Sequence, residues 1–155
     1  MITAADTNIL LDILIPDESH LKSSKALLDE CAGKGQLIIC EIVYSELASQ
    51  FFSERDLKAF LSDTGIRLIH SGEKSLYMAG ERWKEYTKNK KQTLQCPQCG
   101  KQITASCTAC HFSFTFRQRI LGDFIIGAHA LLHAETLISR DRGFYKTYFK
   151  DLKIA

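Results

Sequence analysis

Short apolar segments alternate with longer segments of helical periodicity along this chain, and this alternation restricts its fold more than any other feature. The apolar segments have the length and the Ile, Leu and Val content of buried strands. Strands separated by helices favour a parallel sheet that is covered on both faces. We therefore predict an α/β protein with three layers, α/β/α, around a central parallel sheet.

The expected elements follow from these patterns. Strands are expected at Met1–Ala5, Gln36–Cys40, Ile66–Ile69, Glu135–Ile138 and Leu152–Ile154. Helices are expected at Ile9–Ile15, Ser19–Cys31, Glu41–Phe52, Glu54–Ser62, Gly72–Asn89, Leu121–Ala134 and Arg140–Phe149. A chain of 155 residues accommodates one such domain and a small insertion. No apolar run approaches the roughly 20 residues of a membrane span, and the first residues lack a secretory pattern, so we expect a cytoplasmic protein with no membrane partner.

Four acidic residues stand in apolar surroundings, unlike most of the eighteen acids in the chain. Asp6 directly follows the first strand, and Asp141 follows the strand that ends at Ile138. Glu46 lies beside Leu47 on an apolar helix, and Asp123 lies within an apolar run. Ligands of parallel α/β folds gather beyond the carboxyl ends of the strands, where Asp6 and Asp141 are expected.

Carboxylates in one partly buried site repel one another unless a cation neutralises them. Mg²⁺ and Mn²⁺ prefer such oxygen ligands, and they support hydrolysis of phosphodiester bonds. The pattern therefore predicts a metal-dependent nuclease site at Asp6, Glu46, Asp123 and Asp141. For Asp141, a surface ion pair with Arg140 or Arg142 is the alternative explanation.

Four sequence blocks together resemble the PIN-domain nucleases. They are Ala5–Leu10, Val43–Ala48 around Glu46, Gly122–Ala130 and Leu137–Phe144, and the resemblance covers the chain apart from roughly residues 91–118. It implies a Mg²⁺- or Mn²⁺-dependent endoribonuclease with Asp6, Glu46, Asp123 and Asp141 as metal-site acids. Thr7, Asn8 and Ser139 match positions that support the site in this family.

The resemblance also implies partners. Many small members look like toxins of VapBC toxin–antitoxin pairs, which are dimeric and inhibited by an antitoxin, whereas others process RNA. The segment 92–118 departs from the minimal toxin pattern, which puts the toxin role in doubt. We therefore keep both roles open, with RNA as the substrate, an antitoxin as a candidate partner and a homodimer as a candidate assembly.

Two Cys-x-x-Cys pairs lie within this inserted segment. Cys96, Cys99, Cys107 and Cys110 can direct four thiolates at one ion, which suits structural Zn²⁺ in a small zinc ribbon. Disulfides, a redox-active pair and an iron–sulfur site are the alternatives. Four cysteines complete a tetrahedral site, so we expect His111 to be a bystander. His129 and His133, four residues apart on a helix, are expected to pack rather than to bind a metal.

A basic segment surrounds the cysteine pairs. Between Arg82 and Arg119 there are eight basic residues and one acid, so this segment carries +7 and the remainder of the chain −5. Such a block on an acidic body indicates a polyanionic partner, although a solvated lysine-rich helix end explains it as well. The candidate nucleic-acid-binding residues are Lys88, Lys90, Lys91, Lys101, Arg117 and Arg119.

The hypothesis that joins these features is an RNA endonuclease whose acidic site cuts while the ribbon positions the substrate. The alternative is a non-catalytic nucleic-acid- or ribosome-binding module that uses the ribbon. An aspartate-nucleophile phosphatase is excluded, because it needs a second Asp two residues after the first and position 8 is Asn.

Overall fold

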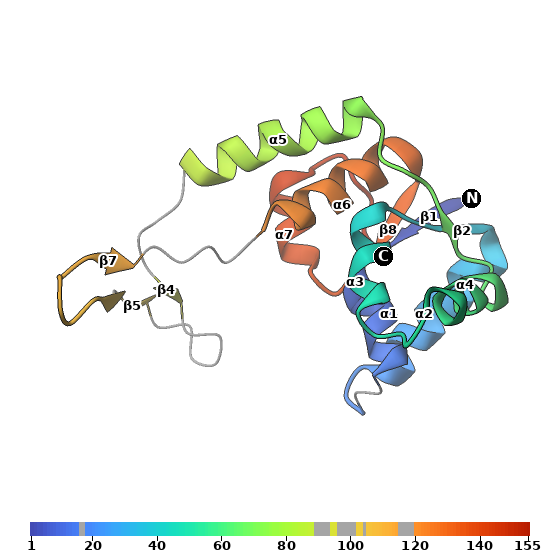
Figure 1. Ribbon diagram of the computed structural model, residues 1–155. Coiled ribbons are helices and arrows are strands. Elements are labelled where there is room, and N and C mark those ends of the chain that lie inside the picture. The colour runs from blue at the N-terminus through green and yellow to red at the C-terminus, as the bar shows by residue number, and fades with distance from the viewer. Residues whose placement is uncertain (16–17, 89–93, 96–101, 104, 115–119) are drawn as a thin grey trace.

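A four-stranded parallel sheet forms the centre of the molecule. The computed structural model describes residues 1–15, 18–88, 94–95, 102–103, 105–114 and 120–155 (Figure 1). The sheet has the strand order β3-β2-β1-β8, and each neighbouring pair is parallel. Its strands are β1 (Ile2–Ala5), β2 (Gln36–Ile39), β3 (Arg67–Leu68) and β8 (Thr136–Ile138). The predicted parallel sheet is therefore confirmed.

Helices connect the strands and cover the sheet on both faces, as the predicted three-layer α/β/α fold requires. Helix α2 packs on β2, α6 packs on β1 and β8, and α5 runs along α6 (Figure 1). The described helices are α1 (Thr7–Leu14), α2 (Leu21–Lys34), α3 (Glu41–Ala48), α4 (Glu54–Asp63), α5 (Glu73–Lys88), α6 (Leu121–His133) and α7 (Arg142–Tyr148). None of them is long and apolar enough to cross a bilayer.

Burial on both faces explains why the strands are apolar without alternation. Ile38, Ile39, Leu137 and Ile138 are all at most 3% exposed, and they form the core together with α6. The expected strand at Leu152–Ile154 is wrong as a full strand. Only an isolated parallel bridge joins Leu137 to Ile154, because the chain after α7 meets the edge of β8 at a single position.

The strand order brings the first and last parts of the chain together. Because β1 and β8 are neighbours, the backbone N–H of Asp6 donates to the carbonyl of Ile138 at 3.0 Å. The residues that follow β8 therefore lie beside the residues that follow β1. Asp6 and Ser139 are far apart in the sequence but lie side by side at this edge of the sheet.

The segment expected as an insertion contains two small antiparallel pairs. Strand β4 (Leu94–Gln95) pairs with β5 (Gln102–Ile103), and β6 (Ala105–Ser106) pairs with β7 (Ser113–Phe114). In Figure 1 the labelled strands β4, β5 and β7 lie to the side of the helices that cover the main sheet. These pairs are not part of the four-stranded sheet.

His129 and His133 pack within α6 and against the start of α5, as the sequence predicted. Their rings stack with centroids 4.6 Å apart. His129 is 1% exposed and its Nδ1 lies 3.2 Å from the Ser71 hydroxyl, while His133 Nε2 lies 3.3 Å from the Ser75 hydroxyl. Burial, and then the nearby His133, lower the pKa of His129 from 6.5 to about 4.

This burial predicts a loss of stability in mild acid. The unfolded chain binds a proton at His129 below pH 6.5, whereas the folded chain does not bind it until about pH 4. The contribution of neutral His129 is therefore complete above pH 6.5 and declines as the pH falls toward 4, by at most about 3 kcal/mol. Urea unfolding at several pH values should show this decline in the wild type and a flatter profile in His129→Asn. Identical profiles would contradict the assignment.

Candidate active site

The four predicted acids surround one hollow beyond the carboxyl ends of the strands. Its volume is about 420 Å³, and no basic side chain lines it among the described residues. The lining residues are Asp6, Thr7, Asn8, Leu11, Glu46, Ser49, Gln50, Asp123, Ile126 and Asp141. They come from the β1–α1 junction, from α3 and its end, from α6 and from the residue that precedes α7.

Asp6 lies at the base of this hollow and is 6% exposed. Its Oδ1 accepts the backbone N–H of Thr7 at 2.8 Å, so the same carboxylate also caps α1. Its Oδ2 accepts from Asn8 Nδ2 at 2.8 Å, from Ser139 Oγ at 2.6 Å and from Tyr145 Oη at 3.2 Å. These bonds hold the carboxylate in one orientation.

The protonation of Asp6 reflects opposing effects. Burial raises its pKa above the ordinary value, whereas hydrogen bonds from Ser139, Thr7 and Tyr145 lower the pKa. The negative charge of Asp123 raises the pKa of Asp6 further, which means that the two carboxylates repel each other. A positive charge bound between them would relieve this repulsion.

Glu46 and Asp123 contribute from two helices. The Thr7 hydroxyl donates to Glu46 Oε2, which links α1 to α3 at the wall of the hollow. Asp123 lies in the first turn of α6, where its Oδ2 accepts the backbone N–H of Ile120 at 3.1 Å. A carboxylate in the first turn is favoured by the helix dipole. Both side chains are half-buried at the hollow.

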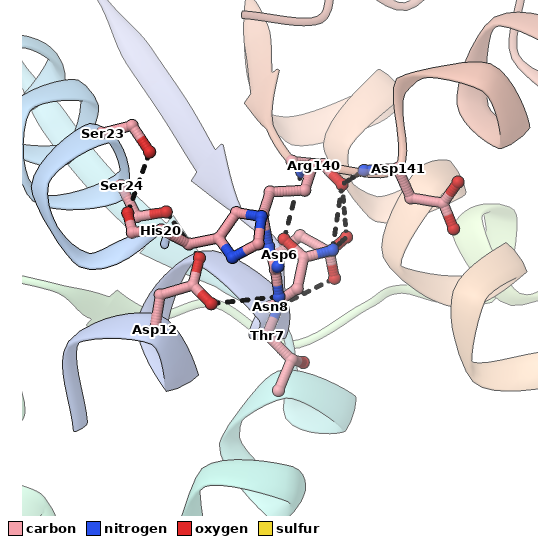
Figure 2. Close-up of polar contacts among 10 residues, drawn as sticks. Asp6, Thr7, Asn8, Asp12, His20, Ser23, Ser24, Arg140 and Asp141 are labelled. Atoms are coloured by element: carbon pink, nitrogen blue, oxygen red, sulfur yellow. Dashed lines mark hydrogen bonds and ion pairs between the residues drawn. The ribbon is translucent and has the colours of Figure 1, made fainter. Parts of the chain in front are cut away.

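Asp141 lines the hollow from the segment after β8, and Ser139 hydrogen-bonds to it. Asp141 precedes α7, and its backbone N–H donates to Ser139 Oγ at 2.9 Å. Asn8 Nδ2 lies 3.3 Å from the same hydroxyl, and Asn8 Oδ1 accepts the backbone N–H of Arg140 at 3.2 Å. Figure 2 shows this network between the β1–α1 junction and the segment after β8. Ser139 and Asn8 thus both donate hydrogen bonds to the Asp6 carboxylate.

The sequence match agrees with this geometry. A sequence model of the PIN domain matches residues 4–150, which is nearly the whole chain. The chain belongs to the PIN domain family. No curated protein matches it significantly.

Solved structures resemble this PIN domain over its full length. One is VapBC2 from Rickettsia felis bound to a DNA fragment from their promoter, with 21% identity and a TM-score of 0.60, covering 100% of this chain and 98% of that chain. Another is VapBC-1 from nontypeable Haemophilus influenzae, with 18% identity and a TM-score of 0.63, covering 100% and 97%. At these identities the likeness concerns the fold.

The acids of this PIN domain fit a divalent cation by their chemistry. They supply only oxygen ligands, which Mg²⁺ and Mn²⁺ prefer, and Asp6, Glu46 and Asp123 have no ion-pair partner in the described part of the chain. As the side chains stand, no three His, Cys, Asp or Glu residues among those described are close enough to form a ready-made metal cluster. Three of the four acids are half-buried at an open hollow, so rotation of their side chains would be needed to bind one ion.

Two residues near the site were not predicted from the sequence. Tyr145 is 1% exposed, and burial followed by the charge of Asp6 raises the pKa of its hydroxyl, which keeps the hydroxyl a donor. Asp12 is 4% exposed and pairs with Arg140 at 3.0 Å between Oδ1 and Nη2. Helical spacing places Asp12 on α1 but does not identify Arg140 as its partner. Tyr145 cannot be distinguished by sequence pattern from the other aromatic residues of the core.

Only half of the predicted zinc ligands can be located. Cys96 and Cys99 lie outside the described residues, whereas Cys107 is half-buried, Cys110 is exposed, and neither forms a disulfide. Backbone N–H groups of Cys110 and Ala109, and then the Cys110 side chain, lower the pKa of Cys107. His111 follows with a φ of 58°, a left-handed residue that ends the turn.

The predicted nucleic-acid-binding residues also fall mostly outside the described chain. Lys88 is the exposed last residue of α5, and it lines a different hollow from the acids. Lys90, Lys91, Lys101, Arg117 and Arg119 lie outside the described residues. Their role in binding stays a prediction.

Proposed function

We propose that this PIN-domain protein is a Mg²⁺- or Mn²⁺-dependent endoribonuclease. The observation that carries the proposal is the hollow itself, where Asp6, Glu46, Asp123 and Asp141 meet and whose described lining contains no basic side chain. A carboxylate site of this kind needs a cation to bind a polyanion. A bound divalent cation lowers the pKa of water and neutralises charge on a phosphodiester.

In this proposal each side chain has a defined part. Asp6, Glu46, Asp123 and Asp141 hold the cation. Ser139, Asn8 and Tyr145 orient Asp6 through their hydrogen bonds to Oδ2, and Thr7 orients Glu46 through its hydroxyl. Loss of a supporting hydroxyl should therefore weaken metal binding less than loss of an acid does.

RNA is favoured as the substrate by the resemblance to PIN-domain nucleases. The two solved structures described above are VapBC proteins, and VapBC pairs are the toxin–antitoxin pairs that the resemblance implied. We infer a cytoplasmic nuclease of the VapC type that an antitoxin holds inactive, with a homodimer as the candidate assembly. An antitoxin encoded by an adjacent reading frame should copurify with the chain and suppress its cleavage.

A cleavage assay on total RNA tests the proposal. The purified chain should cut RNA in the presence of Mg²⁺ or Mn²⁺, and this cleavage should stop when EDTA is added. Binding of RNA without cleavage, across titrations of both ions, would instead support the non-catalytic module.

We further propose that residues 92–118 are an insertion in the PIN domain that holds structural Zn²⁺ through Cys96, Cys99, Cys107 and Cys110. The spacing of the two Cys-x-x-Cys pairs supports this, because each pair directs two sulfurs to one side. The turn at Cys107 supports it too, since N–H groups that lower the pKa of Cys107 favour the thiolate that a metal needs. Metal binding would then stabilise two very short strand pairs.

Metal content tests the ribbon. The protein purified without chelator should contain one Zn²⁺ per chain by mass spectrometry, and Cys107→Ser should lose it. Cys31→Ser is the matched control, because Cys31 is buried on α2 far from the pairs in sequence, and it should keep the zinc. Iron in place of zinc, or an unchanged zinc content in Cys107→Ser, would overturn the assignment.

A further inference from the structure

A second hollow lies beside the acidic one and has the opposite electrostatic character. Its volume is about 310 Å³. Its described lining residues are Ile9, His20, Ser23, Ser24, Leu27, Ser139, Arg140 and Arg142. Two arginines, a histidine and three hydroxyl groups thus face one space, and no carboxylate is among these lining residues. We call this space the basic hollow.

The two hollows share a wall one side chain thick. Ser139 lines the basic hollow, while its hydroxyl donates at 2.6 Å to Asp6 in the acidic hollow. The backbone N–H of Arg140 donates to Asn8, which lines the acidic hollow. In Figure 2 His20 lies toward α2 and Asp141 points to the opposite side, with Arg140 between them. The two hollows are therefore neighbours on the molecule.

The charges of the basic hollow are held in different ways. Asp12 pairs with Arg140 at 3.0 Å and also accepts the Ser24 hydroxyl at 2.6 Å, so Arg140 is anchored while its side chain stays 40% exposed. Arg142, the exposed first residue of α7, has no carboxylate partner among the described residues. The two guanidinium groups of Arg140 and Arg142 carry one more positive charge than the single carboxylate of Asp12 neutralises. The basic hollow therefore presents a positive surface next to the acidic hollow.

We propose that the basic hollow binds a backbone phosphate of single-stranded RNA, one nucleotide away from the phosphate that lies at the acids. The proposal rests on the proposed ribonuclease function and names how that site holds its substrate. Four carboxylates repel a polyanion, so a neighbouring attraction is needed to hold the strand. The forked guanidinium of arginine matches a phosphate group.

The two arginines differ in this subsite. Arg142 binds the phosphate directly, since its charge is free of any described carboxylate. Arg140 acts mainly as a positioning residue, because Asp12 already takes one of its donors and its backbone N–H holds Asn8 against Asp6. Replacement of Arg142 should therefore weaken phosphate binding without changing the positions of the four acids.

Binding of a short single-stranded RNA to the full chain in EDTA tests the subsite without cleavage. Arg142→Gln should weaken binding about tenfold, and the slope of log K against log salt should fall by about 0.7, the value for one lost phosphate contact on a single strand. Lys146→Gln is the matched control, because Lys146 lies one turn further along α7, is exposed and does not line the basic hollow. It should leave both the affinity and the slope unchanged. Arg142→Lys should keep the slope and lose part of the affinity.

The outcomes separate this inference from the proposed function. If the wild type fails to cut RNA but Arg142→Gln alone weakens binding, the subsite stands and the ribonuclease proposal fails. If the wild type cuts RNA but Arg142→Gln and Lys146→Gln bind it equally, the subsite is overturned and the ribonuclease stands. Failure of the wild type to bind RNA overturns the subsite as well. So does an Arg142→Gln variant that loses binding of polyglutamate while its RNA binding is unchanged, since the hollow would then serve an acidic polypeptide.

Discussion

Asp123→Asn is expected to lower the rate of metal-dependent RNA cleavage by at least about 100-fold while the protein stays folded. The substitution removes one negative charge from the acidic hollow and nothing from the core. Asparagine keeps an oxygen that can accept the backbone N–H of Ile120, so the first turn of α6 retains its hydrogen bond. Asp123 suits this test better than Asp6, because the Asp6 carboxylate accepts four hydrogen bonds. An asparagine at position 6 would turn its NH₂ group toward groups that are themselves hydrogen-bond donors.

The control is Asp151→Asn, the same chemical change at an exposed position after α7. Cleavage of total RNA with Mn²⁺ or Mg²⁺ should be normal in this control and absent in Asp123→Asn, while circular dichroism and zinc content match the wild type in both. Cleavage by folded Asp123→Asn near the wild-type rate would remove the acidic hollow from consideration as the site of chemistry.

Gly127→Ala is expected to destabilise the PIN domain by about 1–3 kcal/mol, although alanine is the better helix former. A Cβ at this position of α6 would lie 2.5 Å from Cε2 of Phe149, well inside van der Waals contact. The Phe149 ring is 1% exposed and lies in an aromatic cluster with Phe124 and Phe144, so it has little space into which to move. Overpacking should therefore outweigh the gain in helix propensity.

Gly80→Ala on α5 is the matched control, because a Cβ there meets no atom within 4 Å. It should stabilise the protein by up to about 1 kcal/mol through helix propensity alone. Urea unfolding of the two variants should therefore give changes of opposite sign. A Gly127→Ala variant as stable as Gly80→Ala would mean that α7 and the segment after it do not pack against α6 as described.

That the four acids line one hollow could be predicted from their apolar contexts together with the sequence blocks that resemble the PIN-domain nucleases. Asp6 ends an apolar strand, Asp123 interrupts an apolar helix start, and these contexts are visible in single segments of sequence. Fewer of the residues predicted for the zinc site and for nucleic-acid binding lie in the described part of the chain. Of the four predicted zinc ligands and the six predicted nucleic-acid-binding residues, only Cys107, Cys110 and Lys88 lie in the described chain, so the zinc ribbon and the basic surface remain proposals.

The alternation of apolar and amphipathic segments by itself determined the α/β class, the parallel sheet and the edge at which the acids lie, because periodicity and strand direction are local properties. The tertiary structure alone decided which distant residues meet there. The pairing of β1 with β8 brings Ser139 and Tyr145 onto Asp6, and it brings Arg140 onto Asp12. Such partners depend on strand order and on side-chain direction across more than a hundred residues of chain, which no local pattern records. The four acids are thus a feature of the sequence, whereas their supports and the basic hollow beside them are features of the fold.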